Sequence, residues 1–361
     1  MKIIGVIVSM SVPHPLPTAT SERSAEPTPD TAGAETMKAI VQDEYGTAPE
    51  EVLRLAEIAR PETAADEILV RVHAASVDRG TWHLMAGLPY PIRLAVFGLR
   101  RPKVSNPGRS LAGTVECVGQ EVTGFEPGDE VYGTCDGSFA PYARARASRL
   151  APKPANLSFE QAAAVPVSAL TALQAVRDQA RVEPGQKVLI IGASGGVGTF
   201  AVQIAKAFGA EVTGVCSTAK TDLVRSIGAD HVIDYTREDF ADGQLRYDVI
   251  LDIGGNRRLS HLRRALTPRG RLVLVGGETG GRWLGGMDRL LRAHLLFPLV
   301  SQKLSTFIAS ENAEDLTALR DLIESGKIAP AIDRTYPLSQ TPAAIRHVQE
   351  GRARGKVVIT I

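Results

Sequence analysis

The sequence predicts an α/β fold in two domains, and three observations carry that prediction. At 361 residues, the chain is too long for one compact core of ordinary size. From residue 37 to about 155, short β-rich runs alternate with turn-forming glycines and prolines, as in a small barrel-like domain. After residue 158, continuously apolar strands alternate with helices, which is typical of a doubly wound parallel sheet covered on both faces.

The composition argues against several classes of function. The 41 basic and 40 acidic residues leave a net charge of +1, so no electrostatic footprint for nucleic acid or an anionic membrane is present. The three cysteines, Cys117, Cys135 and Cys216, are far apart and form no CxxC pair, which speaks against a disulfide framework. No apolar tract reaches the ~18 residues of a membrane span. We therefore expect a cytoplasmic protein without nucleic-acid or membrane partners.

The first 36 residues differ in composition from the rest of the chain. They are rich in Pro, Ser, Thr and Ala, which predicts a disordered extension, although the apolar run after Lys2 also has the outline of a signal peptide. An opening strand is expected from Met37. The predicted domains are 37–160, completed by 326–361 where the chain turns β-like again, and 161–325. The helical stretch that opens the second domain has Ser158 as N-cap and Gln161 three residues on, a capping box.

A glycine-rich turn in "IIGASGGVGTF" lies between a predicted buried strand and a predicted helix. It matches the dinucleotide fingerprint with alanine in the first glycine position. Gly195 would let the backbone approach a pyrophosphate, and Gly198 would let the helix pack closely on the strand. The helix N-terminus would present N–H groups to the phosphates. The expected cofactor-binding residues of the turn are Ala193, Ser194, Gly195, Gly196, Val197 and Gly198.

The end of the next strand, "GVCSTAK", predicts a preference for NADPH. NAD enzymes usually carry an acid there, and this chain has Cys216. A carboxylate ~4 Å from the 2′-phosphate would cost about 4 kcal/mol at an effective dielectric of ~20. Ser217 and Thr218 can donate hydrogen bonds and Lys220 offers a charge, although an ordinary loop is the alternative. Tyr235, after the third strand, is a further candidate near the adenine.

Taken together, these features resemble the zinc-free quinone oxidoreductase (zeta-crystallin) branch of the medium-chain dehydrogenase/reductase superfamily. The resemblance covers residues 37–361 and is strongest in "GQKVLIIGASGGVGTFAVQIAK". It implies a GroES-like β-barrel catalytic domain beside a Rossmann domain, an intervening cleft, NADPH and a possible homodimer. It also places Thr171 near the nicotinamide. Gly254, Gly276 and Gly277 follow two strands of the sheet, at the edge where ligands bind in this architecture.

Zinc-dependent relatives in that superfamily have an early cysteine ligand and a Gly-His-Glu run. Here those positions correspond to Asp78 and to Gly108-Arg109-Ser110, and the four-cysteine structural lobe is missing. Arg109 would put a positive charge where a Zn²⁺ ion should sit, and zinc needs about three protein ligands. We therefore predict a metal-free site.

The stretch "AASVDRGTWH" is predicted to face the substrate. The family pattern Asn-x-x-Asp-x-Tyr corresponds here to Asp78, Thr81 and His83, so all three residues depart from it. The hypothesis is that His83, which titrates near neutral pH, donates to the developing oxyanion while Asp78 and Thr81 shape the site. The alternative is that His83 only packs against Trp82 as a wall of the pocket.

The predicted function is NADPH-dependent reduction of a quinone or an α,β-unsaturated carbonyl. Such substrates suit a metal-free site because the negative charge that builds on oxygen can be held by hydrogen-bond donors. The expected substrate is a small apolar carbonyl or quinone. The apolar segment 84–102 suggests a pocket wall or a mobile flap, and 281–300 suggests either a second lid or a subunit or domain interface. Alternatives are an enoyl-thioester reductase, a zinc-independent alcohol dehydrogenase-like enzyme and a catalytically silent NADPH-binding sensor.

Overall fold

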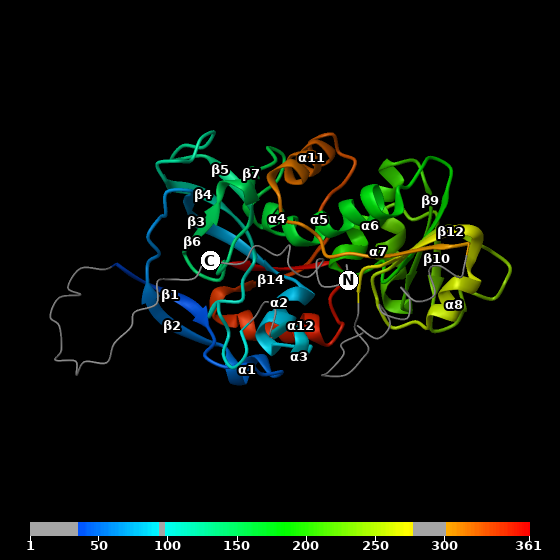
Figure 1. Cartoon of the computed structure of the whole chain (residues 1–361), viewed down its shortest axis with the longest axis horizontal. Helices are drawn as coiled ribbons and strands as arrows, with labels where there is room; N and C mark the ends of the chain where they lie inside the picture. Colours follow the sequence, from blue (N-terminus) through cyan, green and yellow to red (C-terminus); the bar gives the residue numbers. More distant parts are fainter. Residues whose placement is uncertain (1–34, 94–97, 277–300) are drawn as a thin grey trace.

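The computed structural model describes residues 35–93, 98–276 and 301–361, and in these ranges it contains two large sheets (Figure 1). The predicted α/β class is confirmed: one sheet is mixed and largely antiparallel, and the other is entirely parallel. The expectations for residues 1–34, for Gly277 and for the segment 281–300 fall outside the described residues. The domain boundaries stay a prediction.

The first sheet has seven strands in the order β14-β15-β3-β4-β5-β7, with β6 also paired to β3. Its longest strand is β3, and the last strand of the chain, β15, pairs antiparallel with it. A separate antiparallel pair, β1 with β2, opens the described chain. The strands are β1 (Thr36–Val41), β2 (Arg54–Ala59), β3 (Glu67–Val77), β4 (Ser110–Val118), β5 (Glu130–Thr134), β6 (Tyr142–Arg146), β7 (Leu150–Pro152), β14 (Ile332–Pro337) and β15 (Lys356–Thr360).

The second sheet has six parallel strands in the order β10-β9-β8-β11-β12-β13. The strand order reverses direction at β8, so the crevice at the carboxyl ends of β8 and β11 is where this architecture binds ligands. Five of the strands follow the apolar pattern of the sequence. The sixth, β13, is short and polar and gave no sequence signal. The strands are β8 (Lys187–Ile191), β9 (Glu211–Cys216), β10 (His231–Asp234), β11 (Tyr247–Asp252), β12 (Leu266–Leu274) and β13 (Lys303–Thr306).

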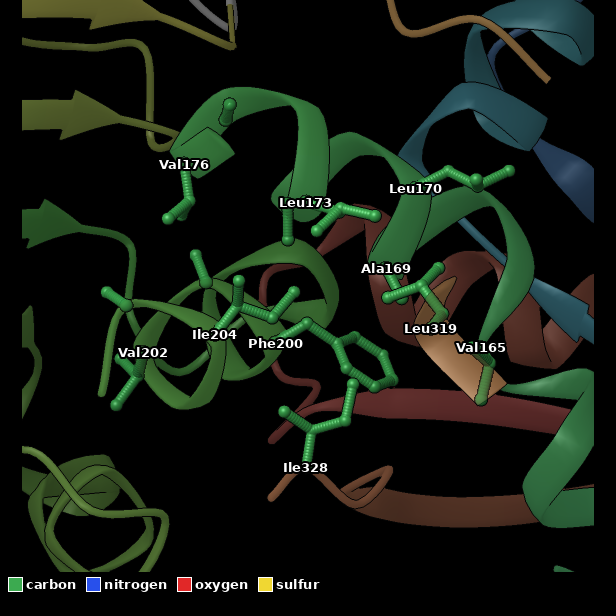
Figure 2. Packing of buried hydrophobic residues seen from close by; sticks show 14 of the residues in the cluster. Val165, Ala169, Leu170, Leu173, Val176, Phe200, Val202, Ile204, Leu319 and Ile328 are labelled. Atoms are coloured by element: carbon green, nitrogen blue, oxygen red, sulfur yellow. The ribbon is translucent and has the colours of Figure 1, made fainter. Parts of the chain in front are cut away.

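Helices α5 and α6 form the core between the two sheets. Figure 2 shows Phe200 of α6 beside Ile328, with Leu173 of α5 and Val176 of the π-helical turn after it in the same view, and all four side chains are buried in one cluster. The predicted capping box is confirmed, because the Ser158 hydroxyl accepts the Gln161 N–H at 3.3 Å and the Gln161 side chain accepts the Ser158 N–H at 2.9 Å. These helices are α4 (Phe159–Ala163), α5 (Pro166–Gln174), continued by a π-helical turn to Ala180, and α6 (Gly196–Ala207).

The described residues contain further α-helices besides α4, α5 and α6. They are α1 (Pro49–Val52), α2 (Arg79–Ala86), α3 (Tyr90–Ile92), α7 (Thr221–Ser226), α8 (Leu259–Arg264), α11 (Ala313–Glu324) and α12 (Thr341–Gln349). Helix α2 lies beside α12, and α11 packs on α5 (Figure 1). No helix in the described residues has both the length and the apolar character needed to cross a bilayer.

Candidate active site

The turn between β8 and α6 is held in shape by two glycines. Gly192 has a φ of +86°, the left-handed region that a residue with a Cβ rarely adopts. A Cβ there would also lie 3.1 Å from the backbone nitrogen of Gly254. The glycine that makes the tight turn is therefore Gly192. The sequence predicted the first fingerprint position at Ala193, one residue later, although Gly192 is visible in the sequence at the end of "IIG".

Gly198 holds α6 against the turn. A Cβ at this position would lie 2.8 Å from the backbone of Ala193, closer than real Cβ atoms approach backbone. Gly195 is the N-cap, and a Cβ on it would meet only the Gly192 carbonyl, at 3.5 Å. The first amides of α6 have no intrahelical acceptor, and the helix dipole favours an anion there. This cradle fits a dinucleotide pyrophosphate.

The other residues predicted in the turn differ in exposure. Ala193 is fully buried and Ser194 is 6% exposed, whereas Gly196 and Val197 are half-buried. The Ser194 carbonyl accepts the Gly355 N–H at 2.9 Å, so the backbone of the turn is joined to the segment before β15. Ala193 and Ser194 therefore shape the turn from beneath.

The end of β9 forms the corner expected to hold the adenosine ribose. Burial raises the pKa of the Cys216 thiol to about 11, so this side chain is neutral at physiological pH. Ser217 is half-buried and Thr218 is exposed. The Thr218 hydroxyl donates to Asp234, and this hydrogen bond, with others from Thr236, holds the pKa of that carboxyl below its usual range. Asp234 was missed from the sequence, although it precedes Tyr235 in "VIDY".

Lys220 and Tyr235 flank this corner in different ways. The Lys220 ammonium donates to the carbonyls of Gly351 and Ala353, each at 2.7 Å, and burial lowers its pKa. Its charge is therefore held by the segment before β15. Tyr235 is 49% exposed, and the Arg257 guanidinium lies over its ring at 5.5 Å from the centroid.

Three further predicted cofactor residues lie at the carboxyl edge of the sheet or on α5. Thr171 is half-buried on α5 and its hydroxyl donates to the Val167 carbonyl at 2.8 Å. Gly254 donates its N–H to the Ile191 carbonyl at 3.1 Å, which ties the end of β11 to the end of β8. Gly276 follows β12, and a Cβ on it would clash with the Ile253 carbonyl oxygen.

Asp78 is at the centre of a buried polar cluster. It is 8% exposed and forms an ion pair with Lys356, which is 1% exposed. Its carboxylate also accepts hydrogen bonds from Ser168 at 2.6 Å and from Ser110 at 3.3 Å. Lys356 lies 278 positions further along the chain, and neither it nor Ser168 is predicted from the sequence as a partner of Asp78. No local pattern signals such a contact.

The two other residues of the predicted substrate-facing loop lie on α2. Thr81 is fully buried, and its hydroxyl accepts the Asp78 N–H at 3.3 Å. His83 is half-buried, and its Nδ1 lies 3.0 Å from the Leu88 carbonyl oxygen. Its ring meets Trp82 edge-on, with centroids 5.0 Å apart. Of the three predicted residues, only His83 is open enough to touch a substrate.

Comparison with known proteins identifies the family. An alcohol dehydrogenase GroES-like domain model matches residues 64–155, and a zinc-binding dehydrogenase model matches residues 227–359. The mouse protein NAD(P)H oxidoreductase RTN4IP1, mitochondrial, is 33% identical, over 90% of this chain and 89% of its own length. The chain belongs to the medium-chain dehydrogenase/reductase superfamily, in its quinone oxidoreductase branch. It is an NAD(P)H-dependent oxidoreductase, as expected from the glycine turn.

Other members of the superfamily extend the comparison. The tomato (Solanum lycopersicum) 2-methylene-furan-3-one reductase is 33% identical, over 90% of this chain and 79% of its own length. The quinone oxidoreductase of Escherichia coli, solved in complex with NADPH, superposes with a TM-score of 0.75 at 27% identity, covering 90% of this chain and all of that one. These matches confirm the GroES-like and Rossmann assignments.

Arg109 is the residue that the family resemblance aligns with a histidine zinc ligand. Its guanidinium is bound by Glu311, at 2.6 Å, and by Asp136, at 2.6 Å. Burial opposes the charge of Arg109, but these carboxylates outweigh it and raise the arginine pKa. Within the described ranges, no group of three or more His, Cys, Asp or Glu side chains is placed to hold a metal ion. A metal-free site stays a prediction, now supported by a fixed cation at this position.

Proposed function

We propose that the protein is a metal-free reductase that uses NADPH to reduce a quinone or an α,β-unsaturated carbonyl. The observation that carries the proposal is the junction of two features: the dinucleotide cradle of α6 and helix α2 with His83, joined through the Asp78–Lys356 pair. Several relatives are named for related chemistry, among them an alkenal/one oxidoreductase of Arabidopsis thaliana and a quinone oxidoreductase of Triphysaria versicolor.

The bound cofactor supplies a hydride to the electron-poor carbon of the acceptor. The protein must then stabilise the negative charge that develops on the acceptor oxygen and provide a proton. His83 is the residue of the predicted set that is exposed enough to do this. Asp78 and Thr81 are buried beneath it and support the start of α2. The alternative, in which His83 only packs against Trp82 as a wall of the pocket, is tested by the His83→Phe variant.

The hydrogen bond to Leu88 defines how His83 can act. A carbonyl oxygen only accepts, so Nδ1 of His83 must carry a proton in this contact. In the neutral ring, Nε2 is then an acceptor, and it becomes a donor only when the imidazole is protonated. His83 is therefore an acid in its charged form. Turnover should fall as the pH rises, because the charged form that can donate from Nε2 is lost.

The His83→Phe and His83→Gln variants test this role. If His83 is the proton donor, both variants should lower kcat by about 10²–10⁴-fold and lose the pH dependence of the wild-type enzyme. The measurement is NADPH absorbance during turnover from pH 5.5 to 8.5. A His83→Phe enzyme with full kcat at every pH would leave His83 as a wall of the pocket.

Several features support NADPH as the preferred cofactor. The end of β9 carries a neutral thiol instead of a carboxylate, because burial raises the pKa of Cys216. A hollow of about 470 Å³ is lined by three arginines, Arg257, Arg258 and Arg264, together with Asn256, Ser260 and His261, and the Arg257 guanidinium lies over the ring of Tyr235. Asp234 and Asp239 are the opposing acids: Arg237 lies 3.7 Å from Asp234, and Asp239 pairs with His261 at 2.8 Å. A 2′-phosphate would be attracted to this corner.

The ratio of kcat/KM for NADPH and NADH tests the cofactor preference directly. Arg257→Gln should lower kcat/KM for NADPH by about 10-fold or more, because a charge-assisted hydrogen bond contributes ~1.5–3 kcal/mol. It should leave NADH almost unaffected. Arg54→Gln is the control, because Arg54 pairs with Asp43 in an exposed bridge away from this corner. A wild-type preference for NADH would contradict the proposal.

A panel of acceptors separates the proposed substrate class from its alternatives. Quinones, enones, enoyl-CoA esters and simple ketones are each assayed with NADPH, and we expect turnover with quinones or enones. Preference for enoyl-CoA would favour the enoyl-thioester reductase, and preference for ketones would favour the alcohol dehydrogenase-like alternative. Binding of NADPH without turnover of any acceptor would favour the sensor.

The compartment and the assembly are also inferred. The three cysteines are free thiols, which suits a reducing compartment, and a cytoplasmic location is our inference. Some relatives carry mitochondrial or chloroplastic in their names, so cell fractionation is the test. A homodimer is expected from the family resemblance. Sedimentation at micromolar concentration would show whether it forms.

A further inference from the structure

The buried cluster around Asp78 joins three segments that are far apart in the sequence. Asp78 precedes α2, Ser168 lies in α5, and Lys356 opens β15. The Lys356 ammonium donates to both of the others, reaching the Ser168 hydroxyl at 3.0 Å. Strand register creates the contact: Val77 of β3 stands opposite Val357 of β15, so Asp78 and Lys356 occupy the next paired position.

The same cluster touches the dinucleotide turn. A Cβ added to Gly196 would lie 3.1 Å from Lys356 Cδ and 3.1 Å from Ser168 Oγ. Directly before Lys356, Gly355 donates its N–H to the Ser194 carbonyl at 2.9 Å and forms a bridge with Gly195. The aliphatic stem of Lys356 therefore packs under the first residue of α6, and its charged end holds Asp78.

The other side of the cluster supports helix α2. Asp78 is the N-cap of α2, and its backbone N–H is held by Thr81. His83 lies further along the same helix, where its Nδ1 contacts the Leu88 carbonyl oxygen. A shift of Asp78 would therefore move the first turn of α2, and with it the side chain that faces the substrate.

We propose that Lys356 is a positioning residue that couples the dinucleotide turn to helix α2. Its ion pair with Asp78 and its hydrogen bond to Ser168 fix the start of α2. They thereby fix the position of the His83 side chain relative to the bound cofactor. Occupancy of the turn then orders α2 through this contact. A buried ion pair is often no more stabilising than an apolar replacement of the same volume, so its role here is to specify geometry. This inference rests on the proposed reductase function.

Steady-state kinetics give the first test, with Lys356→Met, Lys356→Arg and the control Lys153→Met. Lys153 is the matched control because its side chain is only 7% exposed and pairs with Glu130 at 3.2 Å, within the first sheet and its loops. Lys356→Met should lower kcat by up to about 10²-fold, as expected for a misplacement of ~1 Å, while KM for NADPH and for the acceptor changes far less. Lys356→Arg should restore part of kcat. A Lys356→Met kcat equal to that of Lys153→Met would overturn the proposal.

Hydrogen exchange with NADPH alone gives a test that does not depend on the acceptor. In the wild type and in Lys153→Met, NADPH should slow amide exchange both in residues 192–198 and in residues 79–87. In Lys356→Met, protection should remain at 192–198 and be lost at 79–87. Equal protection of 79–87 in Lys356→Met and wild type would contradict the coupling, and so would its absence from the wild type.

A second variant covers the case in which Lys356→Met does not fold. The double variant Asp78→Asn/Lys356→Met removes both charges, and we expect it to fold and still to lose NADPH-dependent protection of 79–87. Retained protection would overturn the proposal. If the wild type reduces no acceptor, the proposed function fails by itself, and the exchange result still decides the coupling.

Discussion

The dinucleotide turn and the loop that leads into α2 meet at one junction, yet they are built in opposite ways. The turn is made of backbone, with Gly192 at φ +86° and Gly198 packed against Ala193. The loop is made of side-chain contacts, with Asp78 bound by residues from α5 and β15. The difference teaches that a backbone site can be recognised locally, whereas a side-chain site depends on distant partners.

The largest effect is expected from breaking the assembled cluster. Lys356→Met leaves Asp78 buried without its cation and should lower the free energy of unfolding by about 3–5 kcal/mol. The double variant Asp78→Asn/Lys356→Met should recover much of this loss, because no charge remains unpaired. Urea denaturation measures both. A Lys356→Met protein with wild-type stability would contradict the expectation that the Asp78 cluster contributes more to the free energy of unfolding than the turn does.

A smaller effect is expected in the turn, where Gly198→Ala and Gly195→Ala should differ. A Cβ on Gly198 meets the Ala193 backbone at 2.8 Å, so overpacking should cost about 1–3 kcal/mol of unfolding free energy. A Cβ on Gly195 has ordinary contacts, so Gly195→Ala should keep its stability and weaken NADPH binding. Thermal melting and titration calorimetry separate the two effects. Equal stability of both variants would contradict the close approach.

A third prediction concerns a second assembled contact, Arg109 with Glu311. Burial would raise the pKa of Glu311, but Arg109, Arg149 and Thr134 outweigh it and hold the pKa below 4.5. The ionised form is thus favoured in the folded state, so this stabilisation is present above pH ~4.5 and is lost as the pH falls through the folded pKa. Glu311→Gln should cost ~1.5–3 kcal/mol at pH 7. The difference in unfolding free energy between Glu311→Gln and the wild type should become smaller below pH 4.5. Urea denaturation at a series of pH values measures it.

The smallest effect is expected for a local device that the sequence shows by itself. Ser158→Ala removes the acceptor of the Gln161 N–H at the start of α4 and should lower the free energy of unfolding by about 1 kcal/mol. Ser158→Asp, which also caps, should restore the stability. If Ser158→Ala cost as much as Lys356→Met, local and assembled contacts would not differ as proposed.

The candidate site also has parts that the local sequence predicts and parts that depend on distant residues. The turn from Ala193 to Gly198 could be predicted because strand, glycines and helix are consecutive. Cys216 was recognised as a missing acid, but Asp234 enters the same corner from the next strand and was not foreseen. Lys220 was expected to offer its charge to a phosphate, and the structure gives that charge to the carbonyls of Gly351 and Ala353.

By itself, the sequence determined the α/β class, the parallel sheet, the glycine turn and the family, because these depend on periodicity and on neighbours within a few residues. Tertiary structure decided which of the three predicted loop residues is accessible. Asp78 is buried where the register of β15 on β3 brings Lys356 against it, Thr81 is fully buried on α2, and His83 is half-buried. Contacts over 278 positions follow from strand pairing, and no local pattern encodes them.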